Sequence, residues 1–130
     1  MNTNDERFLL NGMIFEFDKE KNKLNIEKHG ISFEIAARVF SDYNRIEIYD
    51  AENSLEEDRF DTIGDISFCI KNKSRDTGVI KYIPDEYLLF VVYTERYSVD
   101  DNNGKIEITR IISARPATEF ERGLYYGKGI

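Results

Sequence analysis

The sequence predicts an α+β domain, with two helices near the N-terminus, a mostly antiparallel sheet of three to five strands, and a C-terminal helix. Three observations predict this fold. Apolar residues recur at helical spacing over Phe33–Phe40. After Asp42 the period of the apolar residues changes to two, which is typical of strands. Thr118, with Glu121 three residues later, then forms a capping box that opens a final helix.

The first elements follow from capping residues. A short strand is expected over Met13–Phe17, and Asp18 is suited to cap a helix because its side chain can accept hydrogen bonds from the first backbone N–H groups. Gly30 ends that helix, since glycine readily adopts the left-handed conformation found after a helix. Ser32 can cap the next helix, over Phe33–Phe40, which should bury one face against the sheet.

The strands follow from alternation. Ile46 and Ile48 alternate with polar residues, and a longer strand is expected from Phe60 to Ile70. Leu88–Tyr93 is apolar on both faces, which indicates the centre of the sheet. Lys105–Arg115 is the last expected strand.

Composition indicates one domain. The chain has 130 residues, is 41% hydrophobic and holds nine Phe and eight Tyr, which is ample for a single core. We expect one domain over residues 1–130, with residues 1–12 as a polar N-terminal extension. A single cysteine and the lack of a long apolar run favour a cytoplasmic protein without a membrane span.

The net charge of −7 arises from 18 Lys and Arg against 25 Asp and Glu. A negative field repels phosphate, so the balance counts against broad nucleic-acid binding. Seven of the acids lie between Asp50 and Asp65, where Arg59 is the only basic residue. Such a stretch is usually solvated surface, but it could also receive a basic partner.

The strand register decides which candidate residues share a face of the sheet, because alternate side chains point to opposite faces. Arg110 and Arg115 have opposite parity and should point apart unless a bulge intervenes. The more polar face can gather Arg59 and Arg115 with Glu95 or Arg96. Arginine suits a phosphate-facing surface, since its planar fork donates two parallel hydrogen bonds to phosphate oxygens.

His29 is the only histidine, so a histidine-based acid or base step must use it. Its expected place in the last turn of a helix favours the protonated form, which could donate to a phosphate or a leaving group. The alternative is a residue that only binds the last carbonyl groups of the helix.

Several motifs together resemble the BrnT family of bacterial toxins. The segments that carry the resemblance, in chain order, are Phe15-Glu16-Phe17-Asp18, Lys28-His29-Gly30-Ile31-Ser32-Phe33-Glu34, Ala36-Ala37-Arg38-Val39-Phe40, Glu57-Asp58-Arg59-Phe60, Ile63-Gly64, Val91-Val92-Tyr93-Thr94-Glu95-Arg96 and Arg110-Ile111-Ile112-Ser113-Ala114-Arg115 with Glu121-Arg122. The chain departs from the family pattern at Phe17, where Trp is common, at Lys19, often Pro, and at Asn53, often His.

The resemblance implies a ribonuclease toxin with a RelE-like fold, which acts without a cofactor or metal and is neutralised by a BrnA-like ribbon-helix-helix antitoxin in a hetero-oligomer. The residues that match the pattern give His29, Arg59, Glu95, Arg96 and Arg115 as catalytic candidates. Lys28, Arg110 and Arg122 are the RNA-binding candidates.

The leading interpretation is RNA cleavage in which Glu95 or another carboxylate helps the ribose 2′-hydroxyl attack the adjacent phosphate. Arg59 and Arg115 would stabilise the developing charge, and His29 or Lys28 would serve as acid or phosphate contact. Two alternatives stay open. The chain could be a catalytically silent or weak module that binds the antitoxin. It could also be a magnesium-dependent nuclease that uses the acids Asp50, Glu57, Asp58 or Asp61 as ligands.

Overall fold

The protein, described here from a computed structural model, folds around one six-stranded mixed sheet with the strand order β1-β2-β6-β5-β4-β3. The structure describes residues 3–71, 87–100 and 102–127. The strands are β1 (Asp5–Leu10), β2 (Met13–Asp18), β3 (Ile46–Tyr49), β4 (Phe60–Asp65), β5 (Leu88–Val99) and β6 (Lys105–Pro116). The helices of the described ranges are α1 (Lys19–His29), α2 (Phe33–Ala36), α3 (Ser67–Lys71) and α4 (Glu119–Tyr126), with 3₁₀ turns η1 (Ala37–Ser41) and η2 (Ala51–Asn53).

The predicted fold class was wrong in the make-up of the sheet and of the N-terminal helices. The sheet has six strands rather than three to five, and it is mixed because β2 runs parallel to β6. The extra strand is β1, which lies inside the segment expected to be a polar extension. It forms a hairpin with β2 through Asn11 and Gly12, whose φ angles of 51° and 81° suit a tight turn between antiparallel strands.

The second predicted helix is also shorter than expected. Its α-helical part ends at Ala36 and continues as the 3₁₀ turn η1, while Ser32 accepts the hydrogen bond of the Ile35 N–H as an N-cap. Asp18 caps α1 through the N–H groups of Glu20 and Lys21, and Gly30 ends α1 with a φ of 69°, as the sequence predicts.

The predicted strand from Phe60 to Ile70 is cut short. β4 ends at Asp65, whose side chain accepts a hydrogen bond from the Ser67 N–H at 2.8 Å. The chain then enters α3. The alternation of Ile66, Phe68 and Ile70 is therefore not a strand signal, because a carboxylate that binds the backbone two residues on forms a turn.

The core lies between one face of the sheet and the segment α2–η1. Phe15 and Phe17 of β2 and Val91 of β5 join Phe33 and Phe40 in one buried cluster. Gly64 of β4 lies directly under η1, since a Cβ atom there would be 2.7 Å from the Val39 Cβ. We call this the covered face of the sheet and the opposite one the open face.

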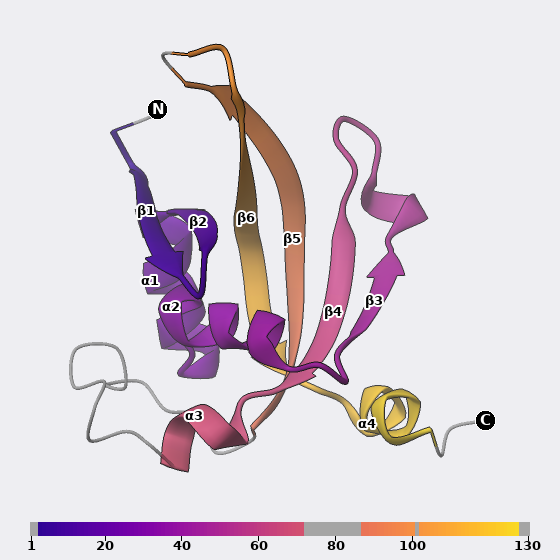
Figure 1. Cartoon of the computed structure of the whole chain (residues 1–130). Coiled ribbons are helices and arrows are strands. Elements are labelled where there is room, and N and C mark those ends of the chain that lie inside the picture. The colour runs from indigo at the N-terminus through magenta and orange to yellow at the C-terminus, as the bar shows by residue number, and fades with distance from the viewer. Residues whose placement is uncertain (1–2, 72–86, 101, 128–130) are drawn as a thin grey trace.

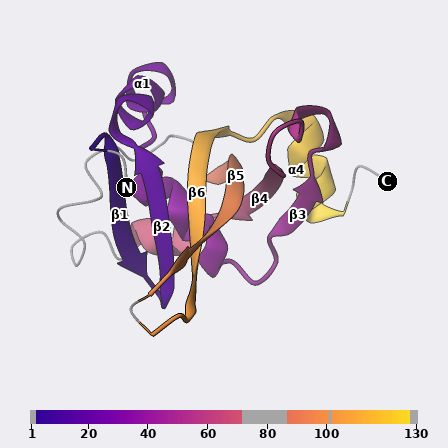
Figure 2. The ribbon, with the colours of Figure 1, turned by 90° about the horizontal axis from the view of Figure 1, so that it is seen from above.

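The ends of the sheet carry different helices. Figures 1 and 2 show α1 beside β1 and β2, and α4 at the other side, beside β3 and β4. The predicted capping box is present in α4, with Thr118 accepting from the Glu121 N–H and Glu121 accepting from the Thr118 N–H. No helix of the described ranges is long and apolar enough to cross a membrane.

Candidate active site on the open face of the sheet

A bulge in β6 brings the two arginines of the last strand to one face. Val92 pairs with Ser113, but the next residue, Tyr93, pairs with Ile111, so Ile112 is an extra residue in β6. The extra residue reverses the parity of the strand. Arg110 and Arg115, expected to point apart without a bulge, therefore both point to the open face, opposite the buried Ile111 and Ala114.

Arg115 is held in place by three groups. Its Nη1 and Nη2 atoms donate to the two carboxylate oxygens of Glu121 at 2.7 and 2.8 Å. Nη1 also donates to the Pro116 carbonyl at 3.2 Å. The guanidinium lies 4.2 Å from the centre of the Phe90 ring, a distance typical of a cation–π contact. The side chain is still 36% exposed, so it is fixed but open to solvent.

Asn25 attaches α1 to β6 beside this arginine. Beyond Arg110, β2 no longer pairs with β6. The Asn25 amide takes the place of a strand there, since it donates to the Ala114 carbonyl at 2.9 Å and accepts from the Ala114 N–H at 3.2 Å. It also donates to the Ile31 carbonyl at 2.9 Å, which fixes the segment that follows the helix.

His29 lies one helical turn after Asn25, near Arg115. Burial, together with the charges of Lys28 and Arg115, lowers the pKa of His29 below 6.5. The sequence-based expectation was the reverse, because the helix dipole favours the protonated ring. At this site desolvation and the two neighbouring cations outweigh the dipole, so the ring is mostly neutral at pH 7. The exposed Lys28 lies in the same turn.

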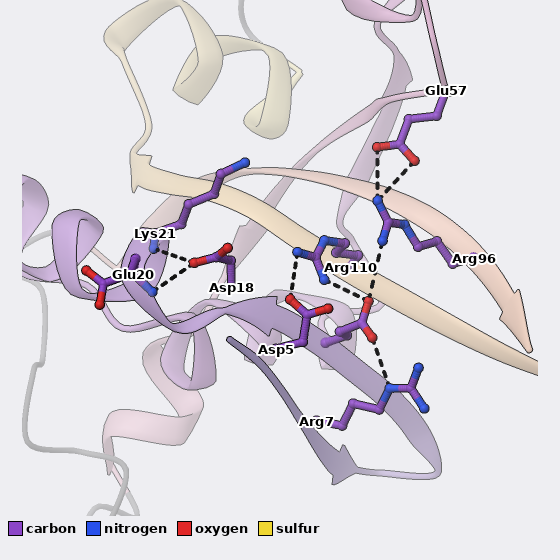
Figure 3. A network of polar contacts seen from close by, with 9 residues as sticks. Asp5, Arg7, Asp18, Glu20, Lys21, Glu57, Arg96 and Arg110 are labelled. Atoms are coloured by element: carbon purple, nitrogen blue, oxygen red, sulfur yellow. Dashed lines mark hydrogen bonds and ion pairs between the residues drawn. The ribbon is translucent and has the colours of Figure 1, made fainter. Parts of the chain in front are cut away.

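Arg96 and Arg110 meet around a carboxylate that is not among the predicted site residues. Glu16 of β2 is almost completely buried, with 4% of its side chain exposed. It accepts from Arg110 at 2.8 Å and from Arg7 at 3.0 Å, and Arg96 lies 3.8 Å away (Figure 3). Arg110 is also paired with Asp5 at 3.0 Å. We call Glu16 and these three arginines the Glu16 cluster.

Arg96 has a second, exposed partner. Its Nη2 atom lies 3.4 Å from a carboxylate oxygen of Glu57. Figure 3 shows the two side chains facing each other. Both side chains are partly exposed, at 42% and 39%. Glu57 lies in the acidic segment between η2 and β4, so this pair ties that segment to the open face of β5.

The remaining predicted site residues lie elsewhere. Glu95 has the parity of Tyr93, which is in the core, so Glu95 points away from Arg96, Arg110 and Arg115. Arg59 lines a pocket of about 250 Å³ together with Asn53, Leu55, Glu56 and Glu57. Arg122 lies on α4, with its guanidinium 5.8 Å from the centre of the Tyr126 ring.

Asp61 is a site residue that the sequence suggested only as a metal ligand. It lies on β4 with the parity of Ile63, facing the open side. Burial, then the charges of Asp50 and Glu121, raise its pKa to about 6, while Arg115 acts in the opposite direction. Its Oδ1 atom is buried and has no hydrogen-bond partner among the residues that the structure describes.

Glu121 shows the contrasting behaviour. Although burial opposes ionisation, the hydrogen bonds from Arg115 and Thr118 lower its pKa. The pKa values of these two carboxyl groups therefore differ. Glu121 ionises well below neutral pH, whereas Asp61 ionises near it. Such a difference is typical of sites that move protons. Strand alternation predicts the face on which Asp61 lies, and the capping box predicts the position of Glu121 on its helix. Only the fold brings the two acids together.

The acids suggested as magnesium ligands do not gather. Within residues 3–71, 87–100 and 102–127, no group of three or more His, Cys, Asp or Glu is placed to hold a metal ion. Glu57 instead lies beside Arg96, and Asp58 accepts a hydrogen bond from the Tyr49 hydroxyl at 3.0 Å.

Comparison with known proteins gives one match to a family model. The model describes the ribonuclease toxin, BrnT, of type II toxin–antitoxin systems, and it matches residues 17–71. The matched part includes His29, Arg59 and Asp61, whereas Arg110 and Arg115 lie beyond it. A search of curated proteins finds no match. The resemblance that the sequence motifs predict is confirmed over residues 17–71, where the chain is similar to the BrnT ribonuclease toxins of type II toxin–antitoxin systems.

Proposed function

We propose that this chain is an endoribonuclease toxin that cleaves RNA without a metal ion and so inhibits translation. The observation that carries the proposal is the Arg115 guanidinium, fixed by Glu121 and Phe90 on the open face with His29 nearby. Arginine has five N–H donors, and the described residues occupy three of those of Arg115. The two that remain are available to a phosphate.

The chemistry is attack of a ribose 2′-hydroxyl on the adjacent phosphodiester. Negative charge gathers on the phosphate oxygens as the 2′-oxygen attacks, and a prepositioned guanidinium stabilises that charge without having to reorganise. Arg115 fills this role, and Arg59, which lines the pocket before β4, is the second candidate. The products are a 2′,3′-cyclic phosphate and a 5′-hydroxyl.

His29 donates the proton to the leaving 5′-oxygen in this mechanism. Its lowered pKa makes it a stronger acid when protonated, but reduces the protonated fraction at pH 7. We therefore expect His29 to contribute most below neutral pH. Lys28 in the same turn supplies a further phosphate contact.

The other basic candidates hold the RNA strand. Arg96 and Arg110 lie on the open face, and we assign them phosphate contacts along the substrate, with Arg122 on α4 as a further contact. Each phosphate that they neutralise makes binding more sensitive to salt. Glu95, on the covered side of the sheet, is not well placed to act with them.

The partner proposed for the toxin is a BrnA-like ribbon-helix-helix antitoxin, in a hetero-oligomer. The family match supports an antitoxin in general, because the family is that of type II toxin–antitoxin systems. The acidic segment over residues 50–65 is the surface of this chain that best complements a basic partner.

A catalytically silent antitoxin-binding module is the second candidate. One observation favours it: Arg96, Arg110 and Arg115 are all paired with carboxylates, and a paired guanidinium attracts phosphate less than a free one. This candidate predicts tight binding of the antitoxin by a chain that cleaves no RNA.

The test is cleavage of a structured RNA by the purified chain in excess EDTA, with the new 3′ ends examined for cyclic phosphate. We compare the wild type with Arg115→Ala, His29→Ala and a matched arginine control, Arg45→Ala, whose side chain pairs with Glu47 on the covered face. Removing one charge-stabilising donor typically costs about 10²–10³-fold in rate. We expect that loss for Arg115→Ala only, and a smaller one for His29→Ala.

Cleavage that persists in EDTA and yields cyclic ends supports the mechanism. Loss of cleavage in EDTA that is restored by magnesium would instead select the metal-dependent alternative. No cleavage by a folded wild-type chain that still binds antitoxin would select the silent module.

A further inference from the structure

We propose that Asp61 is the general base that takes the proton from the attacking ribose 2′-hydroxyl. This inference rests on the proposed function, which leaves the base unassigned because Glu95 points to the covered face. Asp61 is an acid on the same face as Arg115, and it has an oxygen that no described residue binds.

The pairing of the strands places Asp61 beside the candidate site. Asp61 pairs with Val92, which pairs with Ser113, and in the adjacent row Ile63 pairs with Phe90, which pairs with Arg115. Arg115 thus starts two strands and one row away from Asp61, and the charges of Arg115 and Glu121 both act on the Asp61 carboxyl group. Arg115 and Glu121 therefore extend over the part of the open face that Asp61 occupies.

Three charged groups from other segments act on Asp61. Asp50, before η2, and Glu121, on α4, disfavour the ionised carboxylate, and Arg115, on β6, favours it. The flanking partners on β3 and β5 are uncharged, Ile48 and Val92. Arg115 directs two of its N–H groups to Glu121, so the cation only partly offsets the two acids.

The consequence is a carboxyl group poised near neutral pH. An unperturbed aspartate is a weak base, whereas burial and the two acids raise the pKa of Asp61 to about 6. A base works best when its pKa lies close to the operating pH, because it is then both ionised and able to hold a proton. Asp61 meets both conditions.

The step balances as follows. An Asp61 oxygen accepts the proton of the 2′-hydroxyl while the bond between the 2′-oxygen and phosphorus forms. The bond between phosphorus and the 5′-oxygen breaks, and the 5′-oxygen leaves with a proton from His29. Water then returns the proton to His29 and removes the one on Asp61. No oxidant, metal or further reactant is needed.

The test is the single-turnover rate of RNA cleavage between pH 4.5 and 8.5 for the wild type, Asp61→Asn, Asp61→Glu and Glu52→Gln. Glu52 is an exposed acid of the same acidic segment, so its change removes one charge without touching the site. For the wild type and the control, the rate should rise with pH near 6 as Asp61 loses its proton, and fall again at higher pH as His29 loses its own. Asp61→Asn should lose about 10²–10⁴-fold in rate, together with this rise.

The glutamate variant separates a base from a structural residue. Asp61→Glu should recover part of the rate and show its own rise with pH, which a purely structural role would not give. Circular dichroism and urea unfolding establish that the asparagine variant is folded. If the wild type cleaves RNA and Asp61→Asn keeps both its rate and its pH rise, the assignment of Asp61 fails and the proposed function stands. If the wild type cleaves nothing, both fail.

Discussion

Removing the carboxylate of Glu16 should destabilise the protein far more than removing that of Glu57, although both contact Arg96. The Glu16 side chain is 4% exposed and is the common partner of three arginines. Glu16→Ala leaves Arg110, itself only 14% exposed, with Asp5 as its remaining acid. Breaking a buried pair by removing one partner costs about 3–5 kcal/mol. The exposed pair of Glu57 and Arg96 contributes about 0–1 kcal/mol.

Urea unfolding at pH 7, followed by circular dichroism, measures this difference. With an m-value of about 2 kcal/mol/M, Glu16→Ala should lower the midpoint by about 2 M and Glu57→Ala by less than about 0.5 M, at unchanged m. Glu16→Gln should fall between them, since an amide keeps the size but offers only one acceptor oxygen. Equal shifts for Glu16→Ala and Glu57→Ala would refute the reasoning that burial decides what these ion pairs contribute.

Three further outcomes follow from the described contacts. Asn25→Ala removes three buried hydrogen bonds and should lower the free energy of unfolding by about 2–4 kcal/mol; a loss below 1 kcal/mol in urea unfolding would contradict this. Gly64→Ala places a Cβ atom 2.7 Å from that of Val39 and should cost about 1–3 kcal/mol, with a lower melting temperature in calorimetry. The NMR titration of His29 should give a pKa below 6.5 that rises towards 6.5 in Arg115→Gln, because a repelling cation is removed; no rise would show that Arg115 does not act on the ring.

Much of the local structure could be predicted because its signals are local. The caps of α1 and α4 are single side chains that bind the next backbone N–H groups, and both lie where the sequence places them. Asn11-Gly12 is an equally local signal for the hairpin of β1 and β2, but the polar residues around it favour the prediction of an extension. No local sequence signal predicts the parallel pairing of β2 with β6, since alternation does not identify the partner of a strand.

The site was less predictable because it depends on one bulge. Strict alternation sends Arg110 and Arg115 to opposite faces, and the extra residue Ile112 puts them on the same one. Glu16 alternates with Phe15 and Phe17, so its face follows from the sequence, but its arginine partners come from three other strands. The charge state of Asp61 depends on acids from two other segments, and a composition or motif carries no information on such distances.

The acidic balance of the chain and its proposed RNA substrate are compatible because of where the carboxylates lie. Glu121 binds both terminal nitrogens of Arg115, and Glu16 binds one terminal nitrogen of Arg110, which fixes each guanidinium at a set orientation on the open face. A guanidinium paired in this way attracts phosphate less strongly. However, it is a donor that needs no reorganisation when charge develops in the transition state. The affinity for RNA should then be modest. The rate of the chemical step should depend on the pairing of Arg115 with Glu121. Glu121→Gln, which keeps the capping acceptor but weakens the hold on Arg115, should therefore lower the single-turnover rate more than it changes the Kd for RNA. A tighter Kd at unchanged rate would show that Glu121 only masks the arginine.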